Sequence, residues 1–237
     1  QDYPLAVMAQ KMFSGIDSYS LIAVPLFIFA GDLMSKGGLS KRLIQFSNVL
    51  VGHVHSGIAM VAILACMLFA AVTGSAIAAS AAIGGMLIPQ MIKEGYGKSF
   101  SASLIATGGS IGPIIPPSIP LLIYGTLVNV SIAKCFIGGI IPGIIMGIAL
   151  MIYSYFIGKR RGYKGSRNKM APIIEIISNA KSAALAISMP VIIIGGIMAG
   201  VFTPTEAGAI AVFFSFIVGK FIYRDLKWLD IPKVLKS

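Results

Sequence analysis

Long apolar stretches alternate with short polar ones along the chain. Most of the apolar stretches carry few charged residues and approach the length of about 20 residues that a helix needs to cross a bilayer. These stretches cover residues 18–34, 57–72, 76–91, 132–157, 183–201 and 207–223. The pattern predicts an all-α polytopic membrane protein.

Two of the more polar segments are also predicted to be helical. In residues 35–50, lysine and arginine alternate with leucine, isoleucine and phenylalanine at helical spacing. This spacing predicts an amphipathic helix that lies at the membrane interface. A semi-polar helix over residues 172–182 is expected to lead into the span 183–201.

Composition agrees with the membrane class. The mean hydropathy is +0.90 and charged residues make up 11% of the chain. The net charge of +11 does not indicate nucleic acid, because the cations cluster between apolar stretches, as they do in cytoplasmic loops. The most basic loop contains Lys159, Arg160, Arg161, Lys164, Arg167 and Lys169.

Counting spans from the basic loop predicts the topology. The loop 93–98 and the tail 224–237 then lie on the same, cytoplasmic, side as the basic loop. The segment 57–91 starts and ends on that side, either as two full spans or as a re-entrant hairpin. Its second arm is rich in Ala, Gly and Ser, and its tip lacks aromatic or basic residues of an interface, which favours the hairpin.

Residues 99–130 form an apolar segment that cannot be one regular helix. Pro113, Pro116, Pro117 and Pro120 lack a backbone N–H, and each disfavours helix in the residue before it. Unpaired carbonyls in such a break suit a small cation, and the helix that restarts beyond it offers N–H groups to an anion. Secondary transporters build their sites from broken helices in this way, whereas the alternative is a structural kink or a loop.

The tip of the hairpin is the second candidate for a site. Thr73 and Ser75 supply hydroxyl groups, and Gly74 permits a tight reversal of the chain. The alternative is an ordinary turn in which Ser75 caps the following helix.

Other polar residues have structural interpretations. Asp32 is expected at the membrane interface, and Glu206 at the start of a helix with Thr203 or Thr205 as its cap. His53 and His55 have no acidic neighbour, and Cys66 and Cys135 lack metal-ligand spacing. Catalytic motifs such as H-E-x-x-H, G-x-S-x-G and the P-loop do not occur, so the chain is not expected to be an enzyme.

Five motifs together resemble one known family. They are "PLFIFAGDLMSKGG", "MLFAAVTGSAIAASAAIGGMLIPQM", "GYGKSFSASLIATGGSIGPIIPPSIP", "GGIIPG" and "GVFTPTEAG". Over nearly the whole chain, in order and rough spacing, they resemble the large membrane subunit of tripartite ATP-independent periplasmic (TRAP) transporters.

The resemblance implies a sodium-coupled, elevator-type transporter of organic anions such as C4-dicarboxylates or sialic acids. It implies inverted repeats, a bacterial inner-membrane location, a periplasmic substrate-binding protein and a small membrane subunit as partners, besides the lipid bilayer. The parts are then a scaffold span with an arm helix (1–50), a transport part (51–131), spans with the basic loop (132–201) and the start of a second repeat (202–237).

The resemblance also implies site residues. A sodium ion would be held, largely by carbonyl groups, at Thr73, Gly112, Ile115 and Pro117. The substrate would lie near Ser75, Pro116 and Ser118. The family more often has Ser at position 73. Thr supplies the same hydroxyl and carbonyl oxygens, so this difference does not remove a ligand.

The chain begins at Gln1 and resembles only the N-terminal half of the family's large subunit. A second hairpin, a second broken helix and a cationic residue that clamps the substrate carboxylate are expected in the C-terminal half. This half alone is not expected to transport. The alternative interpretation is a non-transporting membrane scaffold or assembly module, and an ion channel would need a continuous polar stripe.

Overall fold

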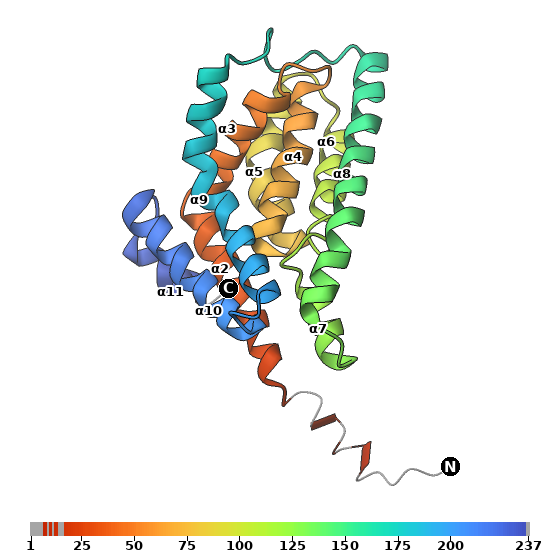
Figure 1. Cartoon of the computed structure of the whole chain (residues 1–237). Coiled ribbons are helices and arrows are strands. Elements are labelled where there is room, and N and C mark those ends of the chain that lie inside the picture. The colour runs from red at the N-terminus through yellow and green to blue at the C-terminus, as the bar shows by residue number, and fades with distance from the viewer. Residues whose placement is uncertain (1–6, 9, 11, 14–16, 236–237) are drawn as a thin grey trace, which may run out of the picture.

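The computed structural model describes residues 7, 8, 10, 12, 13 and 17–235, and within them it contains helices and no strands (Figure 1). The first half holds η1 (Tyr19–Ile22), α2 (Ala23–Lys36), α3 (Leu39–Val51), α4 (Gly57–Thr73), α5 (Ala76–Lys93) and α6 (Lys98–Gly109). The second half holds α7 (Ile119–Leu127), α8 (Ile132–Arg161), α9 (Ile173–Met198), α10 (Pro204–Ile217), η2 (Val218–Ile222), η3 (Trp228–Asp230) and α11 (Ile231–Val234).

The predicted all-α polytopic class is confirmed. In the described part of the chain, five helical stretches are long and apolar enough to cross a membrane. They are Tyr19–Lys36, Ala76–Lys93, Ile132–Arg161, Ile173–Met198 and Pro204–Ile222. The interrupted segment is also as predicted, because α6 ends at Gly109 and a new helix, α7, begins only at Ile119.

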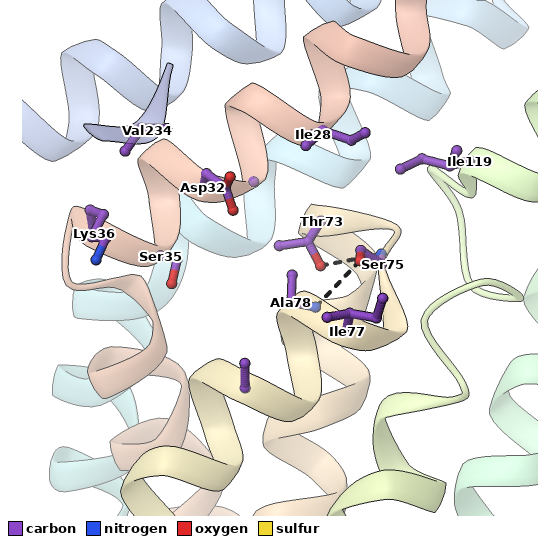
Figure 2. A pocket seen from close by; sticks show the side chains of 12 residues that line it. Ile28, Asp32, Ser35, Lys36, Thr73, Ser75, Ile77, Ala78, Ile119 and Val234 are labelled. Carbon is purple, nitrogen blue, oxygen red and sulfur yellow. Dashed lines mark hydrogen bonds between the residues drawn. The ribbon is translucent and has the colours of Figure 1, made fainter. Parts of the chain in front are cut away.

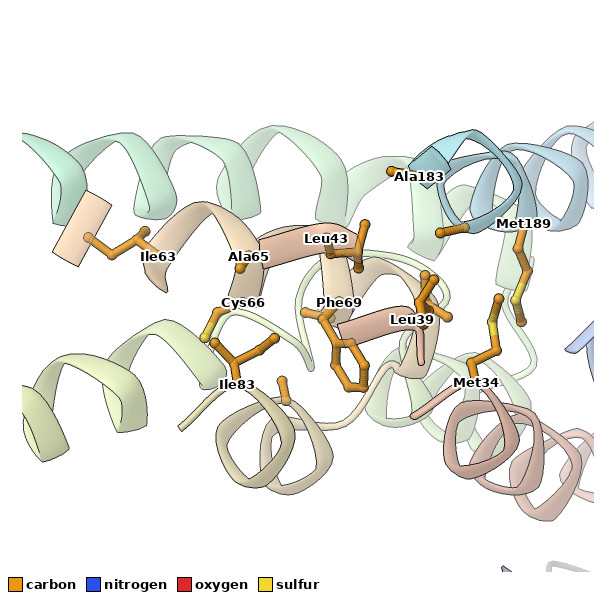
Figure 3. Packing of buried hydrophobic residues seen from close by; sticks show 14 of the residues in the cluster. Met34, Leu39, Leu43, Ile63, Ala65, Cys66, Phe69, Ile83, Ala183 and Met189 are labelled. Atoms are coloured by element: carbon orange, nitrogen blue, oxygen red, sulfur yellow. The ribbon is translucent and has the colours of Figure 1, made fainter. Parts of the chain in front are cut away.

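Helix α4 is the centre of the bundle. It contacts α3, α5, α6, α8 and α9, and buried side chains occupy every side of it. Phe69 and Cys66 are fully buried there beside Ile83 of α5 and Leu43 of α3 (Figure 3). A helix that is apolar all round is one that is enclosed, and protein rather than lipid encloses this one.

Two flanking helices have neighbours or bounds that the sequence pattern did not define. Helix α3 packs along α4 and α9, so its apolar residues Leu39 and Leu43 are buried by protein. Its amphipathic pattern defined an apolar side without defining what covers that side. The segments 172–182 and 183–201 belong to one continuous helix, α9, because no Gly or Pro separates them.

The loop between α5 and α6 and the loop between α8 and α9 lie at the same end of the bundle, as the span count predicted (Figure 1). Tyr96 of the first loop stacks on Tyr163 of the second, with ring centroids 3.9 Å apart. The hydroxyl of Tyr96 also lies 3.4 Å from Oγ of Ser56, and burial raises the pKa of Tyr96 to about 12. The phenol therefore stays protonated and can keep donating this bond.

Helices α2 and α10 run parallel to each other. At their starts, Oγ1 of Thr205 donates to the carbonyl of Tyr19 at 2.9 Å. At their far ends, Arg42 pairs with Asp225 at 2.6 Å. The tail that follows α10 therefore lies beside the junction of α2 and α3 and does not reach the basic loop.

The sequence offered Thr203 or Thr205 as the cap of α10. Thr203 is the cap, and its Oγ1 accepts a hydrogen bond from the N–H of Glu206 at 3.3 Å. The carboxylate of Glu206 accepts from the N–H of Thr203 at 2.7 Å. This reciprocal pair is a capping box, and it explains Glu206 without a functional role.

A stripe of glycine along α8 receives the broken segment. A Cβ atom at Gly139 would overlap the carbonyl oxygen of Ile114, and one at Gly143 would overlap the side chain of Ile115. One turn further on, Gly147 meets Met67 of α4. Small residues at this spacing let backbones approach closely inside a membrane protein.

The glycine stripe predicts a sharp difference between two neighbouring positions. Gly139→Ala should lower the stability of the protein by about 1–3 kcal/mol, because the new methyl group meets a backbone carbonyl. Gly138→Ala is the matched control, because nothing lies within 4 Å of a Cβ atom there. It should be neutral or stabilising by up to about 1 kcal/mol. Thermal unfolding in detergent measures both, and equal effects would contradict the packing of the break against α8.

Candidate functional site

The tip of the α4–α5 hairpin and the break between α6 and α7 are in direct backbone contact. A Cβ atom at Gly74 would overlap the carbonyl oxygen of Pro117. A Cβ atom at Gly112 would lie 3.1 Å from the carbonyl carbon of Ser75. Two stretches of non-helical backbone, distant in sequence, therefore meet at one place inside the bundle.

The local sequence of the tip explains its shape. Gly74 adopts a left-handed conformation with φ of 61°, and its N–H donates to the carbonyl of Ala70 at 2.8 Å, which ends α4. Ser75 then caps α5, because its Oγ accepts from the N–H of Ala78 at 3.3 Å. The capping interpretation of Ser75 is thus correct, and a capping serine can still face a ligand.

Local turns and one helix cap determine the shape of the break. After Gly109 the chain continues through short-range turns, in which the N–H of Gly112 donates to the carbonyl of Gly109 at 2.9 Å. The peptide between Pro116 and Pro117 is cis. Ser118 caps α7 by accepting from the N–H of Leu121 at 3.2 Å, and its hydroxyl donates to the carbonyl of Pro113.

Several carbonyl oxygens of the break have no donor. Those of Gly112, Ile115 and Pro117 accept no hydrogen bond from any described part of the chain. Unpaired carbonyl groups are costly in apolar surroundings, unless they line a wet cavity or coordinate an ion. They are therefore available as ligands.

Thr73 adds a buried hydroxyl group beside these carbonyls. It is 1% exposed, and its Oγ1 donates to the carbonyl of Phe69 at 3.2 Å. The N–H of Ser75 lies 3.5 Å from the same oxygen. Because the hydroxyl proton is used within α4, the oxygen can offer a lone pair outward.

The donor set has the chemistry of a hard-cation site without carboxylate ligands. Among the described residues, no group of three or more His, Cys, Asp or Glu is placed to hold a metal. Neutral carbonyl and hydroxyl oxygens suit a weakly charged hard cation rather than a transition metal. Thr73, Gly112 and Pro117 come together, and the side chain of Ile115 packs against Gly143 of α8.

A cavity of about 570 Å³ opens between the hairpin tip and α2 (Figure 2). Thr73 and Ser75 line it from the tip, as Ile119 does from the start of α7. Pro116 and Ser118 are buried and do not line it. Of the three residues predicted near a substrate, Ser75 is thus the one at this cavity.

The opposite wall of the cavity is α2, which the sequence did not single out. Its lining residues are Ile28, Gly31, Asp32, Ser35 and Lys36 (Figure 2). Their spacing places them on one face of a helix, and this spacing was the available signal. The sequence could not reveal that the face is turned toward the hairpin. Asp32, which was expected at the membrane interface, lies on this wall.

Gly31 brings α2 into contact with the tip. A Cβ atom there would lie 3.0 Å from Cγ2 of Thr73 and 3.2 Å from its Cα. The absence of a side chain at Gly31 therefore allows the hairpin tip to approach α2 and positions Thr73.

The hairpin tip and the broken helix thus meet where several backbone oxygen atoms have no protein donor. Comparison with family models identifies residues 1–237 as the DctM component of tripartite ATP-independent periplasmic transporters. The chain belongs to this family, which is a family of permeases rather than enzymes, and it is a multi-pass membrane protein.

Individual relatives support this family assignment. A putative TRAP transporter large permease protein of Haemophilus influenzae is 47% identical over 97% of this chain and 53% of its own length. The C4-dicarboxylate TRAP transporter large permease protein DctM of Pseudomonas aeruginosa is 40% identical over 96% of this chain and 53% of its own length. The sialic acid TRAP transporter large permease protein SiaM of Vibrio cholerae is 41% identical over 97% of this chain and 53% of its own length.

The chain spans about half the length of these relatives. The part that it matches includes the whole hairpin and the whole broken helix. The tip and the break are therefore features of this family's large permease component.

The contact between the tip and the break predicts unequal effects of two alanine substitutions. Gly74 and Gly95 both have positive φ, of 61° and 88°, so Gly→Ala strains the backbone at both. Only at Gly74 would the methyl group also overlap a backbone carbonyl, that of Pro117. Gly74→Ala should therefore destabilise more than Gly95→Ala, by a further ~1–3 kcal/mol.

Thermal unfolding of both variants in the same detergent gives the difference directly. Gly95 is the matched control, since nothing lies within 4 Å of a Cβ atom at that position. Equal losses would mean that the tip does not rest on the break.

Proposed function

We propose that this chain forms the first ion and substrate site of a sodium-coupled transporter that takes up organic anions. The observation that supports it is the contact between the hairpin tip at Gly74 and the break at Pro117. This contact gathers oxygen atoms that have no protein donor. A sodium ion would supply the missing positive charge and would hold the two non-helical segments together.

The residues that would hold sodium are those expected from the sequence. The carbonyl oxygens of Gly112, Ile115 and Pro117 are unpaired within the described chain, and Thr73 offers a hydroxyl oxygen and its own carbonyl. Sodium binding would stiffen the tip, because the ligands come from both sides of the contact. In this way the ion would prepare the adjoining cavity for the substrate.

The substrate would be a carboxylate anion in the cavity of about 570 Å³ beside Ser75. Helices α5 and α7 both begin at this contact, and their N-terminal ends favour negative charge. C4-dicarboxylate and sialic acid, named for two of the relatives, are both carboxylates. Pro116 and Ser118 would act from behind the cavity wall, by shaping the start of α7.

The transporter would work in the bacterial inner membrane with a periplasmic substrate-binding protein and a small membrane subunit. The name of the family, a tripartite periplasmic transporter, supports this assembly. In an elevator movement the transport part, residues 51–131, would shift relative to the scaffold span, with α3 as the link. The cavity between the tip and α2 lies at the boundary that would change.

The alternative is a membrane scaffold or assembly module that binds no ion. It differs from a transporter in one measurable property, the response of its stability to sodium. A ligand that binds only the folded state raises the unfolding temperature with its concentration.

The sodium site predicts an ion-specific gain in stability. In detergent, sodium chloride should raise the unfolding temperature by a few degrees compared with choline or potassium chloride, a shift that corresponds to about 1–2 kcal/mol. Thr73→Val should lose most of this gain, and Thr73→Ser, which keeps the hydroxyl, should retain it. Thr73→Val combined with Ser75→Ala should abolish it.

Thr126→Val is the matched control for this experiment. Oγ1 of Thr126 donates to the carbonyl of Leu122 at 2.9 Å, the same kind of bond that Thr73 makes to Phe69. The control should therefore lose a similar structural bond and keep the sodium response. Wild type without any response would favour the scaffold, and a full response in Thr73→Val would remove the hydroxyl from the ion site.

A further inference from the structure

A second cavity lies at the end of the bundle where the basic loop folds back. It has a volume of about 420 Å³ and separates the α3–α4 turn from the α8–α9 loop. Here it is called the loop cavity, and its lining residues are His53, His55, Lys159, Gly162, Tyr163, Lys164, Gly165, Arg167 and Asn168. It is remote from the hairpin tip and shares no residue with the cavity there.

The loop cavity carries excess positive charge. Arg167 is neutralised by Glu175, with both nitrogen–oxygen distances at 2.7 Å. Lys159 and Lys164 make no ion pair with any described residue, and the lining includes no acidic side chain. The exposed side chains of Lys159 and Lys164 therefore give the lining of this cavity an excess of positive charge.

Two histidines of the α3–α4 turn, His53 and His55, line the loop cavity. Nδ1 of His53 is inaccessible to solvent and has no hydrogen-bond partner in the described part of the chain. His55 is held at the rim by an edge-on contact with Tyr155, whose ring centroid is 5.8 Å away.

The walls of the loop cavity are held in place by the backbone. The N–H groups of Ser56 and Gly57 donate to the carbonyls of Tyr163 and Lys164, at 3.2 and 3.3 Å. The hydroxyl of Ser166 donates to Oδ1 of Asn48 at 2.8 Å. These bonds hold the backbone of the α8–α9 loop against the α3–α4 turn.

An apolar stripe leads along α8 to the loop cavity. Ile148, Ile152 and Phe156 are 49%, 52% and 64% exposed, on a helix long and apolar enough to span a membrane. Lys159 follows Phe156 by one turn and therefore continues the same side of the helix. The surface is thus apolar along its length and cationic at its end, which matches the two parts of a phospholipid.

We propose that the loop cavity binds the phosphate group of an anionic phospholipid, whose acyl chains lie along the apolar stripe of α8. Lys159 and Lys164 pair with the phosphate oxygens. The lipid then links the α3–α4 turn to the α8–α9 loop. This site is independent of sodium and of the transported anion.

The test compares lipids on the purified full chain. Phosphatidylglycerol added to neutral-detergent micelles should raise the unfolding temperature more than phosphatidylcholine does. Lys159→Gln combined with Lys164→Gln should weaken the apparent affinity for phosphatidylglycerol at least about tenfold, since each lysine near an anionic headgroup contributes appreciably.

The matched control is Arg160→Gln combined with Lys169→Gln. It removes the same charge from the same segment, but neither residue lines the loop cavity. This control should keep the lipid response within about twofold. Equal losses in both double variants would overturn the proposal, because they would show only general attraction between a basic surface and an acidic lipid.

A parallel experiment with inorganic phosphate distinguishes a free phosphate ion from a lipid phosphate group as the ligand. Weak protection by phosphate, displaced by phosphatidylglycerol, supports the lipid assignment. Protection by phosphate equal to that by the lipid would overturn the lipid as the ligand. No response to either in the wild type would overturn the site altogether.

Discussion

A backbone carbonyl that has lost its helical donor needs another polar partner wherever the surroundings are apolar. The prolines between Gly112 and Pro120 create several such carbonyls in the middle of a membrane protein. Several parts of the fold surround these carbonyl groups. The hairpin brings its own non-helical tip to the break, Ser118 caps the restarting helix, and α8 closes the other side with glycine residues. Polar backbone is thereby gathered at one protein-enclosed place instead of being exposed to lipid.

The close approach at this place depends on residues without side chains on three different helices. Gly31 of α2, Gly74 at the hairpin tip and Gly139 of α8 each face backbone or the base of a side chain. Larger residues at these positions would overlap the neighbouring backbone or side chain. The geometry of the oxygen atoms is therefore set by helix packing around them as much as by the residues that carry them.

Much of this arrangement could be predicted from the sequence, because proline, glycine and serine have strong local effects. The ends of the hairpin arms, the break at Gly112–Ser118 and the cap at Thr203 follow from local rules. The packing of α3 against α4 and α9 could not be predicted in the same way, since an amphipathic pattern does not name its partner. The α2 wall with Asp32 and Lys36 was missed for the same reason. The roles of Thr73, Gly112, Ile115 and Pro117 remain predictions.

The enclosure of α4 has a consequence for how the protein is made. This helix is apolar on all sides and would be stable in lipid as soon as it leaves the ribosome. Two of the helices that surround it, α8 and α9, are synthesised later, and α9 ends only at Met198. Until those helices have been made, part of the surface of α4 has no protein neighbour. The protein surroundings of α4 are therefore complete only after α9 has been synthesised.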